Sequence, residues 1–386
     1  MQSSDAPKVL LLSGYHAASH RYWCEQLTAG LKDYHWQLVA LPDRHFYWRV
    51  RSNALTFAFE YPELKQHYDV LLATSMVDVC NLRGLMPHLS SIPTILYFHE
   101  NQFAYPLRSQ VKNNQKKNNS NLINAQLTSI YGALSADRLV FNSEYNRDSF
   151  YAGARLLLKK MPDGTSKELL SELPVRSEVI PVPVSDELSS HAAPVKNRPV
   201  EILWNHRWEY DKQPQVFFAA MKQLLVEGFE ISLHVMGQSF REVPSCFAEF
   251  RQAHGDCIAT WGFQPRDVYH QLLERSDIVV STALHDFQGL GMLEAIAMGC
   301  TPVAPNRMAY PEYIADELLY QVAPDTSNDT SNDTGNAKSE AIEAEMLFKK
   351  IASVIKTPRQ CESDIQRYKS SNLLPVYDRL ISSVLS

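Results

Sequence analysis

The sequence predicts an α/β protein with two doubly wound, Rossmann-like domains that face a central cleft. The chain has 386 residues, more than one ordinary core requires, and its 45% apolar and 21% charged residues are typical of a soluble globular protein. Two series of short apolar runs alternate with segments long enough for helices. Apolar strands that alternate with helices indicate parallel sheets covered on both faces.

The first series of strands occupies the amino-terminal half. Its predicted strands are KVLLLS (8–13), WQLVAL (36–41), DVLLAT (69–74), TILYF (94–98) and DRLVFNS (137–143), with EVIPVPV (178–184) closing the series. Segments such as HRYWCEQLTAGL (20–31) between them are predicted helices. The proline-containing polar run HAAPVKNRP (191–199) predicts a linker. We therefore expect the first domain to span residues 1–190.

The second series predicts a domain over residues 198–360. Its strands are EILWNH (201–206), ISLHVMG (231–237), CIATWGF (257–263), DIVVST (277–282) and TPVAP (301–305), and its helices include QVFFAAMKQLL (215–225), RDVYHQLLER (266–275) and GMLEAIAMG (291–299). Residues 325–336, DTSNDTSNDTGN, contain no apolar side chain and predict a disordered loop. Residues 361–386 predict a helix that packs back across the domain junction.

Charge and cysteine usage limit the class of protein. The formal net charge of -6 argues against general nucleic-acid binding, so a nucleic-acid partner requires a focused basic site. Six cysteines are scattered without a CxxC pair, which is typical of reduced core thiols. No apolar run is long enough for a membrane span or a signal peptide. We expect a cytoplasmic protein that does not enter membranes.

The segment STALHDFQGLGMLEAIAMGCTPVAP (281–305) carries the strongest motif. Asp286 follows a predicted strand, a loop that holds Gly289 and Gly291 comes next, and Glu294 lies in the first turns of the helix that follows. Such glycines let backbone N–H groups approach a phosphate, and a carboxylate accepts two hydrogen bonds from a vicinal diol. The alternative is structural: Asp286 caps the turn, and Glu294 complements the helix dipole.

Two cations follow the first strand of the second domain, in WNHRWEYDKQP (204–214). Arg207 and Lys212 are suited to hold a diphosphate and to neutralise a leaving group, the role of a divalent metal in other enzymes. No cluster of residues has the pattern of a metal site. The alternative is two solvated charges at a helix start. Gly237 and Gly262 predict tight turns beside the same cleft.

Polar residues also follow a strand of the first domain, in FHENQFAYP (98–106). His99, Glu100, Asn101 and Gln102 stand where the strand TILYF ends, and polar groups at such a position usually point into a cleft. The alternative for the histidine is a satisfied strand-end residue.

A basic and aromatic segment, RHFYWRVRSN (44–53), supplies the focused site that the net charge requires. Arg44, Arg49 and Arg51 alternate with aromatic residues that include Trp48, a mixture suited to hold phosphates and to stack on unpaired bases. Arg108, Lys112, Lys116 and Lys117 form a second basic stretch. The alternative is a solvated charged face with Trp48 tucked into the core.

These motifs resemble the retaining glycosyltransferases of family four, which have the GT-B fold. The resemblance rests on Arg207-x4-Lys212 and on the carboxylate-x7-Glu motif from Asp286 to Glu294. It implies that Arg207 and Lys212 stabilise the departing diphosphate, that Glu294 holds the ribose, and that Asp286 positions the sugar. It also implies a catalytic role for His99 and donor-binding roles for Gly237, Phe263, Gly289, Leu290 and Gly291.

A more specific resemblance covers nearly the whole chain. FHENQFAYP, LPDRHFYWRVRSNAL (41–55), NSEYNRDSF (142–150) and HDFQGLGMLEA (285–295), in this order, are similar to the tRNA-queuosine α-mannosyltransferase family. The resemblance implies GDP-mannose as the nucleotide-sugar donor, no further cofactor or metal, and queuosine of a tRNA anticodon as the acceptor. It implies acceptor-binding roles for Arg44, Trp48, Arg49, Arg51, Glu100, Asn101 and Gln102.

Two alternatives remain at this point. A family-four enzyme with a lipid or small-molecule acceptor is expected to carry an exposed amphipathic basic helix near its amino-terminal domain, and the sequence does not predict one. A catalytically idle tRNA-binding protein of the same fold is disfavoured because Arg207, Lys212 and Glu294 are all present. The oligomeric state is not predicted.

Overall fold

The computed structural model describes residues 6–104, 115–162, 167–189, 198–239, 242–322, 333–357 and 364–385. The chain forms two compact units: unit 1 comprises Met1–Pro183 and Tyr368–Ser386, and unit 2 comprises Val184–Arg367. We predicted a first domain that reaches residue 190 and a separate segment from residue 361. In the structure the division lies at residue 184, and the C-terminal segment joins unit 1 from residue 368.

Unit 1 contains a six-stranded sheet in the order β2-β1-β3-β4-β5-β6, with neighbouring strands parallel. The strands are β1 (Lys8–Ser13), β2 (His35–Ala40), β3 (Val70–Thr74), β4 (Thr94–Phe98), β5 (Arg138–Phe141) and β6 (Ser177–Val179). All residues of β3 and β4 are buried, as expected for strands covered on both faces. The five predicted strands are confirmed.

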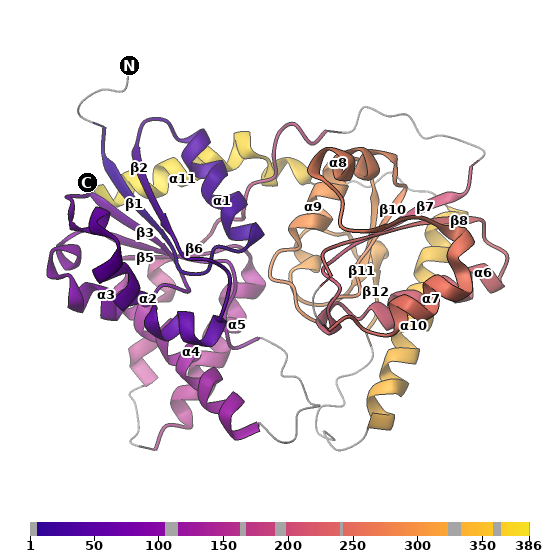
Figure 1. Ribbon diagram of the computed structural model, residues 1–386, viewed down its shortest axis with the longest axis horizontal. Helices are drawn as coiled ribbons and strands as arrows, with labels where there is room; N and C mark the ends of the chain where they lie inside the picture. Colours follow the sequence, from indigo (N-terminus) through magenta and orange to yellow (C-terminus); the bar gives the residue numbers. More distant parts are fainter. Residues whose placement is uncertain are drawn as a thin grey trace. The chain divides into compact units, whose positions relative to one another are not determined.

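Helices cover both faces of this sheet (Figure 1). They are α1 (Ala18–Gly30), α2 (Phe46–Glu60), α3 (Val79–Leu85), α4 (Gln115–Ser135), α5 (Glu144–Lys159) and α11 (Ser370–Leu385). Helices α1 and α11 lie together on one face, whereas α2, α3 and α4 pack on the other. The Trp23 indole N–H donates to the Tyr377 hydroxyl at 3.0 Å, so the C-terminal helix is anchored in the core of unit 1.

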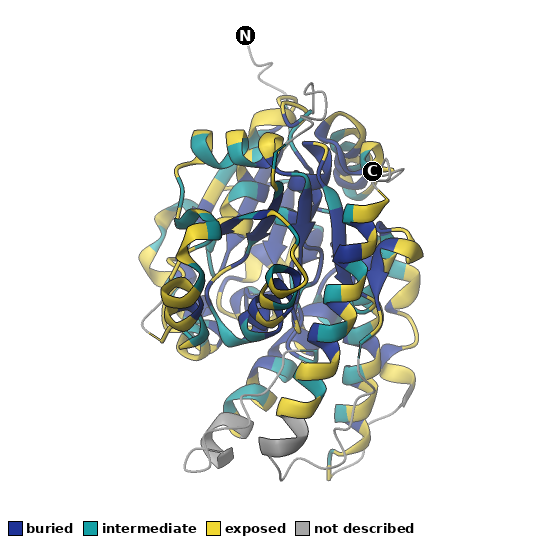
Figure 2. Cartoon of the chain, turned by 90° about the vertical axis from the view of Figure 1, so that its right-hand side faces the viewer, coloured by how far each residue is buried: buried dark blue, intermediate teal, exposed yellow. Residues whose placement is uncertain are grey.

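Unit 2 also contains a six-stranded sheet of parallel neighbouring strands, in the order β12-β11-β10-β7-β8-β9. Its strands are β7 (Val200–Asn205), β8 (Ile231–Met236), β9 (Ile258–Gly262), β10 (Ile278–Val280), β11 (Thr301–Pro305) and β12 (Leu319–Tyr320), and its helices are α6 (Pro214–Val226), α7 (Cys246–His254), α8 (Arg266–Arg275), α9 (Leu290–Ala297) and α10 (Asp333–Lys356). Figure 2 shows buried strands, with the exposed positions concentrated on the outward faces of the helices. Two doubly wound parallel sheets confirm the predicted fold class.

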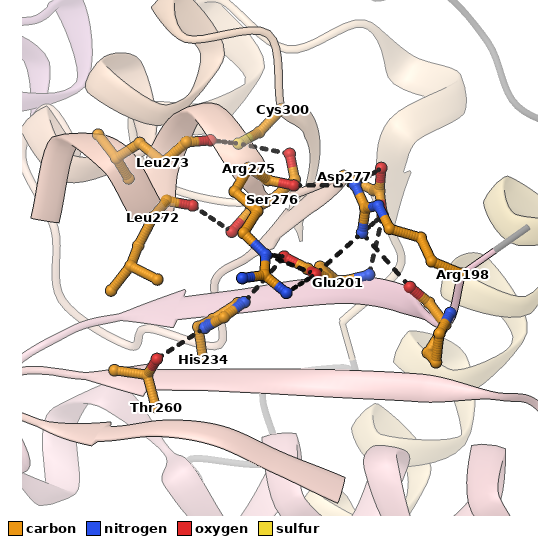
Figure 3. A network of polar contacts seen from close by, with 11 residues as sticks. Arg198, Glu201, His234, Thr260, Leu272, Leu273, Arg275, Ser276, Asp277 and Cys300 are labelled. Carbon is orange, nitrogen blue, oxygen red and sulfur yellow. Dashed lines mark hydrogen bonds and ion pairs between the residues drawn. The ribbon is translucent and has the colours of Figure 1, made fainter. Parts of the chain in front are cut away.

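An ion network around the buried Glu201 stabilises the amino end of the unit 2 sheet (Figure 3). The Glu201 carboxylate, 2% exposed, accepts hydrogen bonds from Arg275 at 2.8 Å and lies 3.1 Å from His234 Nε2. Arg198 lies 3.2 Å from the same carboxylate and 3.0 Å from Asp277. Every charge in the network has a partner, so a buried carboxylate is tolerated here. Glu201 is the second residue of β7, whereas the predicted site follows the carboxyl end of that strand.

Some predicted segments lie partly or wholly outside the described residues. Residues 325–332 of the predicted disordered loop are outside, and Asp333 to Asn336 belong to α10, so the loop prediction is wrong for these four residues. Arg108 and Lys112 of the second basic stretch are also outside, whereas Lys116 and Lys117 fall within α4. No helix among the described residues is long and apolar enough to span a bilayer.

Candidate active site

Lys212 is the central cation of the unit 2 site. It ends the short 3-10 helix Tyr210–Lys212, which follows β7, and it is only 7% exposed. Its ammonium group donates to the His285 carbonyl oxygen and lies 3.6 Å from the Asp211 carboxylate and 3.8 Å from the Asp286 carboxylate. The two carboxylates compensate the buried charge, and all three partners fix the ammonium group in place.

Asp286 is brought to Lys212 by the loop between β10 and α9. One carboxylate oxygen accepts the Gly289 N–H at 3.0 Å, and the other accepts the Tyr310 hydroxyl at 3.1 Å. Burial raises the pKa of this carboxyl, but the charge of Lys212 and further partners outweigh that effect and hold the pKa below its usual value. Asp286 is therefore an ionised acceptor at neutral pH, and its hydrogen bond to Gly289 also shapes the loop.

Glu294 lies in the second turn of α9, which begins at Leu290, in agreement with its predicted place in the first turns of this helix. Its carboxylate accepts the Tyr269 hydroxyl at 3.0 Å, and Asn205 donates to the same Tyr269 oxygen at 3.0 Å. Burial raises the Glu294 pKa to about 7, while the Tyr269 hydrogen bond lowers it. The charge of Arg266 also lowers this pKa, but burial has the larger effect.

Three glycines of the site meet strict steric limits, and Gly291, which was predicted in the loop, is the second residue of α9. Gly289 has a φ of 76°, and a Cβ there would lie 2.5 Å from the Tyr313 hydroxyl oxygen. Gly237 follows β8, and a Cβ there would collide with the His206 carbonyl oxygen at 1.8 Å. At Gly291 a Cβ would lie 3.0 Å from Asn205 Nδ2. The glycines therefore allow close packing of the backbone at the carboxyl edge of the sheet.

The remaining predicted donor residues are more exposed. Arg207 is exposed and pairs with Glu209 at 2.8 Å, so it is held near the surface, in contrast to the buried Lys212. Phe263 is 72% exposed directly after the turn at Gly262, where φ is 90°. Leu290 is partly exposed at the start of α9. Of the two predicted cations, Lys212 is the one that lies within ion-pair distance of Asp286.

Three residues of the unit 2 site were missed by the sequence analysis. Asn205 Oδ1 and His206 Nε2 are buried without a hydrogen-bond partner among the described residues, and burial together with Lys212 lowers the His206 pKa to about 4. Tyr269, on α8, links Asn205 to Glu294. Asn205 and His206 could have been noticed because they are the polar residues that end the predicted strand EILWNH, but the position of Tyr269 on α8 carried no such signal.

In unit 1, His99 follows β4 and is 7% exposed. Its ring stacks on His20 of α1, with the centroids 4.1 Å apart and the planes 20° from parallel. Burial and the neighbouring histidines lower the His99 pKa well below its usual value. Its Nε2 has no hydrogen-bond partner among the described residues. His20 was not predicted as a site residue, because it lies in an ordinary helical segment of the sequence.

Asn101 has a structural role that differs from its prediction. Its Nδ2 donates to the Asn146 carbonyl, the Asn146 Oδ1 and the Ser149 hydroxyl at 2.9–3.0 Å. Its Oδ1 accepts the backbone N–H groups of Phe103 and Ala104 at 2.9 and 3.2 Å. Both donors and both acceptor positions of the amide are occupied, so the side chain is not available to bind an acceptor.

The two neighbours of Asn101, Glu100 and Gln102, differ in how far they are exposed. Gln102 is 5% exposed, and its carbonyl oxygen accepts a hydrogen bond from Gln126 on α4 at 3.0 Å. Glu100 is partly exposed, and its carbonyl oxygen accepts the Ser75 hydroxyl at 3.3 Å. The backbone after β4 is therefore held firmly, whereas Glu100 has a side chain at the surface.

Residues 46–53 of the basic and aromatic segment form the first half of α2, and Arg44 lies just before the helix. Trp48 is 78% exposed, so the alternative of a core tryptophan does not hold. Arg44 and Arg51 are exposed and Arg49 is partly exposed, and Arg51 donates to Thr128 at 3.3 Å and lies 4.0 Å from Asp78. Further along α2, Leu55 and Phe59 are 54% and 70% exposed. Contrary to the sequence expectation, the unit does carry an exposed helix that is both apolar and basic.

Comparison with known proteins agrees with this geometry. Residues 8–184 match the family described as tRNA-queuosine alpha-mannosyltransferase N-terminal, and residues 186–369 match the family described as glycosyl transferases group 1. A tRNA-queuosine alpha-mannosyltransferase of Drosophila melanogaster is 32% identical over 327 residues, which cover 82% of this chain and 84% of the relative. The chain belongs to the tRNA-queuosine α-mannosyltransferase family. It is a glycosyltransferase with the GT-B fold.

Solved structures of this fold are similar over nearly the whole chain. Sucrose-phosphate synthase from Thermosynechococcus elongatus has a TM-score of 0.64 at 14% identity, with 98% of this chain and 99% of that chain covered. Anabaena Alr3699/HepE, solved in complex with UDP and glucose, has a TM-score of 0.62 at 14% identity, with 98% and 100% covered. At this identity the likeness shows the fold alone. The GT-B prediction for this tRNA-queuosine α-mannosyltransferase family member is confirmed.

Proposed function

We propose that this enzyme transfers mannose from GDP-mannose to queuosine in a tRNA anticodon, with retention of the anomeric configuration. The observation that carries the proposal is the 32% identity over 82% of the chain to a tRNA-queuosine alpha-mannosyltransferase. The geometry supports it, because the cation and carboxylates that this chemistry requires lie together at the carboxyl edge of the unit 2 sheet.

The unit 2 residues account for the departure of GDP. As the bond between the sugar C1 and the phosphate oxygen breaks, negative charge grows on the diphosphate, and a fixed cation stabilises that growing charge. Lys212 is such a cation, because its neighbours hold it in place before the reaction begins. Arg207, which is exposed, adds a second cation that can move onto the phosphates. This chemistry needs no metal ion for charge neutralisation.

The carboxylates of unit 2 are assigned to hydroxyl groups of the donor. Glu294 accepts hydrogen bonds from the ribose diol, and Asp286 accepts one from the sugar. The acceptor hydroxyl attacks C1 on the face from which GDP leaves, and its proton passes to the departing phosphate oxygen. Asn205 Oδ1 and His206 Nε2, which have no partner within the described part of the chain, support this assignment, because buried polar atoms without partners are costly unless a polar ligand reaches them.

The acceptor is assigned to unit 1 through α2. An anticodon loop presents unpaired bases and closely spaced phosphates, and the exposed indole of Trp48 together with Arg44, Arg49 and Arg51 matches both features. In a chain of net charge -6, this local group of arginines gives the focused basic site that a nucleic-acid partner requires.

A lipid acceptor remains the second candidate because of one observation. Leu55 and Phe59 extend the exposed apolar surface of α2 beyond Trp48, and apolar side chains beside arginines also suit an anionic lipid surface. Leu55 and Phe59 have no role in the tRNA proposal as stated. The two candidates are separated by the acceptor that receives the sugar.

The decisive experiment is a donor and acceptor panel. The purified enzyme is incubated with GDP-mannose, UDP-galactose or UDP-glucose, and with either queuosine-containing tRNA or anionic phospholipid vesicles, and the products are analysed by mass spectrometry. We expect a hexose on queuosine only with GDP-mannose. Transfer from a uridine nucleotide alone would contradict the donor assignment, and a glycosylated lipid without modified tRNA would contradict the acceptor assignment.

A further inference from the structure

A basic pocket lies against helix α5 of unit 1, in a segment to which the proposed function gives no role. Arg147 belongs to NSEYNRDSF (142–150), one of the four segments that carry the family resemblance. The pocket has a volume of about 330 Å³ and is lined by Arg147, Asp148, Tyr151, Arg155, Pro174 and Ser177. Helix α5 supplies the first four of these residues, and the segment that leads into β6 supplies the other two.

Helical periodicity brings two arginines and a tyrosine to one face of α5. Arg147, Tyr151 and Arg155 follow one another at intervals of four residues, so each lies about one turn beyond the last. The Arg155 guanidinium lies over the Tyr151 ring, 5.9 Å from its centroid, a distance at which a cation and a ring attract each other. Tyr151 is 5% exposed, and its hydroxyl oxygen lies 2.5 Å from Ser177 Oγ. The buried ring is therefore a fixed platform for the exposed Arg155 side chain.

Arg176 adds a third positive charge beside Tyr151. Its guanidinium donates to the Ala136 carbonyl oxygen at 2.6 Å, which holds the half-buried side chain in place. Burial raises the Tyr151 pKa, whereas the charges of Arg176 and of the two α5 arginines act in the opposite direction. Three guanidinium groups are thus close enough to one phenol ring to act on the same ligand.

The charge of this group of residues is positive, which selects an anionic ligand. Asp148 pairs with Arg147 at 2.8 Å and offsets one of the three cations. The Asp148 side chain is 66% exposed, and exposed ion pairs contribute little stability, so a ligand that carries more charge can replace this partner. A guanidinium group presents forked N–H donors that match the oxygen atoms of a phosphate. The chemistry of the pocket therefore fits a phosphate group.

Helix α5 packs on the same face of the sheet as α2, which carries the basic and aromatic segment. Phe57 of α2 and Phe150 of α5 belong to one hydrophobic core, together with the strand residues Leu96 and Phe141. In the order of the sheet, α2 connects the first and third strands, and α5 connects the fifth and sixth. At about 4.8 Å per strand, helices centred over these strands are roughly 15–20 Å apart. Several nucleotides of one RNA strand span that distance.

We infer that Arg147, Arg155 and Arg176 bind a backbone phosphate of the tRNA, as a second contact in addition to the segment on α2. The inference rests on the proposed function, because tRNA is the phosphate-rich substrate that this function assigns to unit 1. The contact gives Arg147 and its segment a role in substrate binding. A phosphate contact positions the tRNA on the protein without reading its sequence.

The test measures tRNA binding at several salt concentrations for the wild-type enzyme and for Arg155→Ala. Arg155 is exposed, so the variant should melt at the wild-type temperature. We expect tRNA binding at low salt to weaken by about 10-fold, as for one lost hydrogen bond to a charged group. The log–log salt slope should fall by about 0.7 to 0.9, because one phosphate is no longer neutralised. An unchanged slope would overturn the inference.

Two further variants separate a local phosphate contact from a general effect of charge. Arg155→Lys retains the positive charge and should keep most of the salt slope. Lys32→Ala is the matched control, because it removes one positive charge from an exposed position just after α1, a helix on the opposite face of the sheet. We expect this control to bind tRNA with the wild-type slope. A loss as large as that of Arg155→Ala would show an effect of net charge alone and would contradict the inference.

Inorganic pyrophosphate distinguishes the tRNA backbone from a free phosphate compound. If Arg155→Ala lowers the affinity for pyrophosphate, measured by calorimetry, but leaves the salt slope of tRNA binding unchanged, the pocket binds a free anion and the inference is refuted. The proposed function fails in a different way. A wild-type enzyme that binds tRNA through this pocket but transfers no mannose would refute that function alone, whereas mannose transfer with an unchanged slope in Arg155→Ala would refute only the phosphate contact.

Discussion

Glu294→Gln should stabilise unit 2 and weaken donor binding at the same time. Burial raises the Glu294 pKa from 4.5 to about 7, so the ionised form is disfavoured in the folded protein. The difference between the two pKa values corresponds to roughly 3 kcal/mol in the free energy of unfolding. We expect an effect of about 2–3 kcal/mol because the side chain is partly exposed. This contribution of Glu294 to the free energy of unfolding is fully present below pH 4.5 and is lost as the pH rises through 7. Glutamine does not titrate, so the variant avoids this loss.

The assay is thermal unfolding at pH 5 and pH 8. At pH 8 the unit 2 midpoint of Glu294→Gln should exceed that of the wild type by roughly 5–10 °C, and at pH 5 the difference should be much smaller. Glu201→Gln is the matched control, because it makes the same chemical change at another buried glutamate. Burial also raises the Glu201 pKa, but Arg275 and His234 prevail and lower it, so this variant should be destabilised at pH 8.

Donor binding provides the functional half of the same prediction. If the ionised Glu294 binds the ribose diol, the wild-type KM for the nucleotide sugar should fall as the pH rises towards 8, and the KM of Glu294→Gln should be high and nearly independent of pH. Two results would refute the reasoning: a Glu294→Gln variant that is destabilised equally at both pH values, or an unchanged KM at pH 8.

Three further variants test the remaining roles. Lys212→Ala should lower kcat by roughly 100-fold or more, because it removes the buried cation beside Asp286; a rate within threefold of wild type at saturating donor would contradict the role in leaving-group stabilisation. The double change of Arg49 and Arg51 to alanine should reduce the log–log salt dependence of tRNA binding by about 0.7 to 0.9 for each phosphate that is no longer neutralised, with donor hydrolysis unchanged, and an unaltered slope would exclude phosphate binding by these arginines. Trp48→Ala should weaken tRNA binding by about 1–3 kcal/mol without a change in melting temperature, because the indole is 78% exposed; a lowered melting temperature would point to a structural role instead.

The strands could be predicted from the sequence because apolar runs such as TILYF and DIVVST are buried on both faces of a parallel sheet. Helix α10 could not, since its first residues belong to the polar SNDT repeat, whose composition is typical of disorder. The repeat was therefore assigned to a loop up to Asn336, four residues too far.

The site could be predicted only in part, because its geometry depends on contacts between distant segments. Lys212 and Asp286 are separated by a whole series of strands and helices, and only the folded sheet brings them to 3.8 Å. No pattern in the sequence indicated that Asn101 uses its whole amide within unit 1, or that His20 stacks on His99. Side-chain partners of this kind are set by tertiary packing, which periodicity and spacing do not report.

The most direct measurement of the central claim uses two tRNAs that differ only in carrying queuosine or guanosine at the same anticodon position. Each is incubated with the purified enzyme and isotopically labelled GDP-mannose, and the nucleosides are then analysed by mass spectrometry. Mannosyl transfer to queuosine predicts one labelled hexose on the queuosine nucleoside and no label on the guanosine tRNA. Equal labelling of both tRNAs, or release of GDP without label in either, would contradict it.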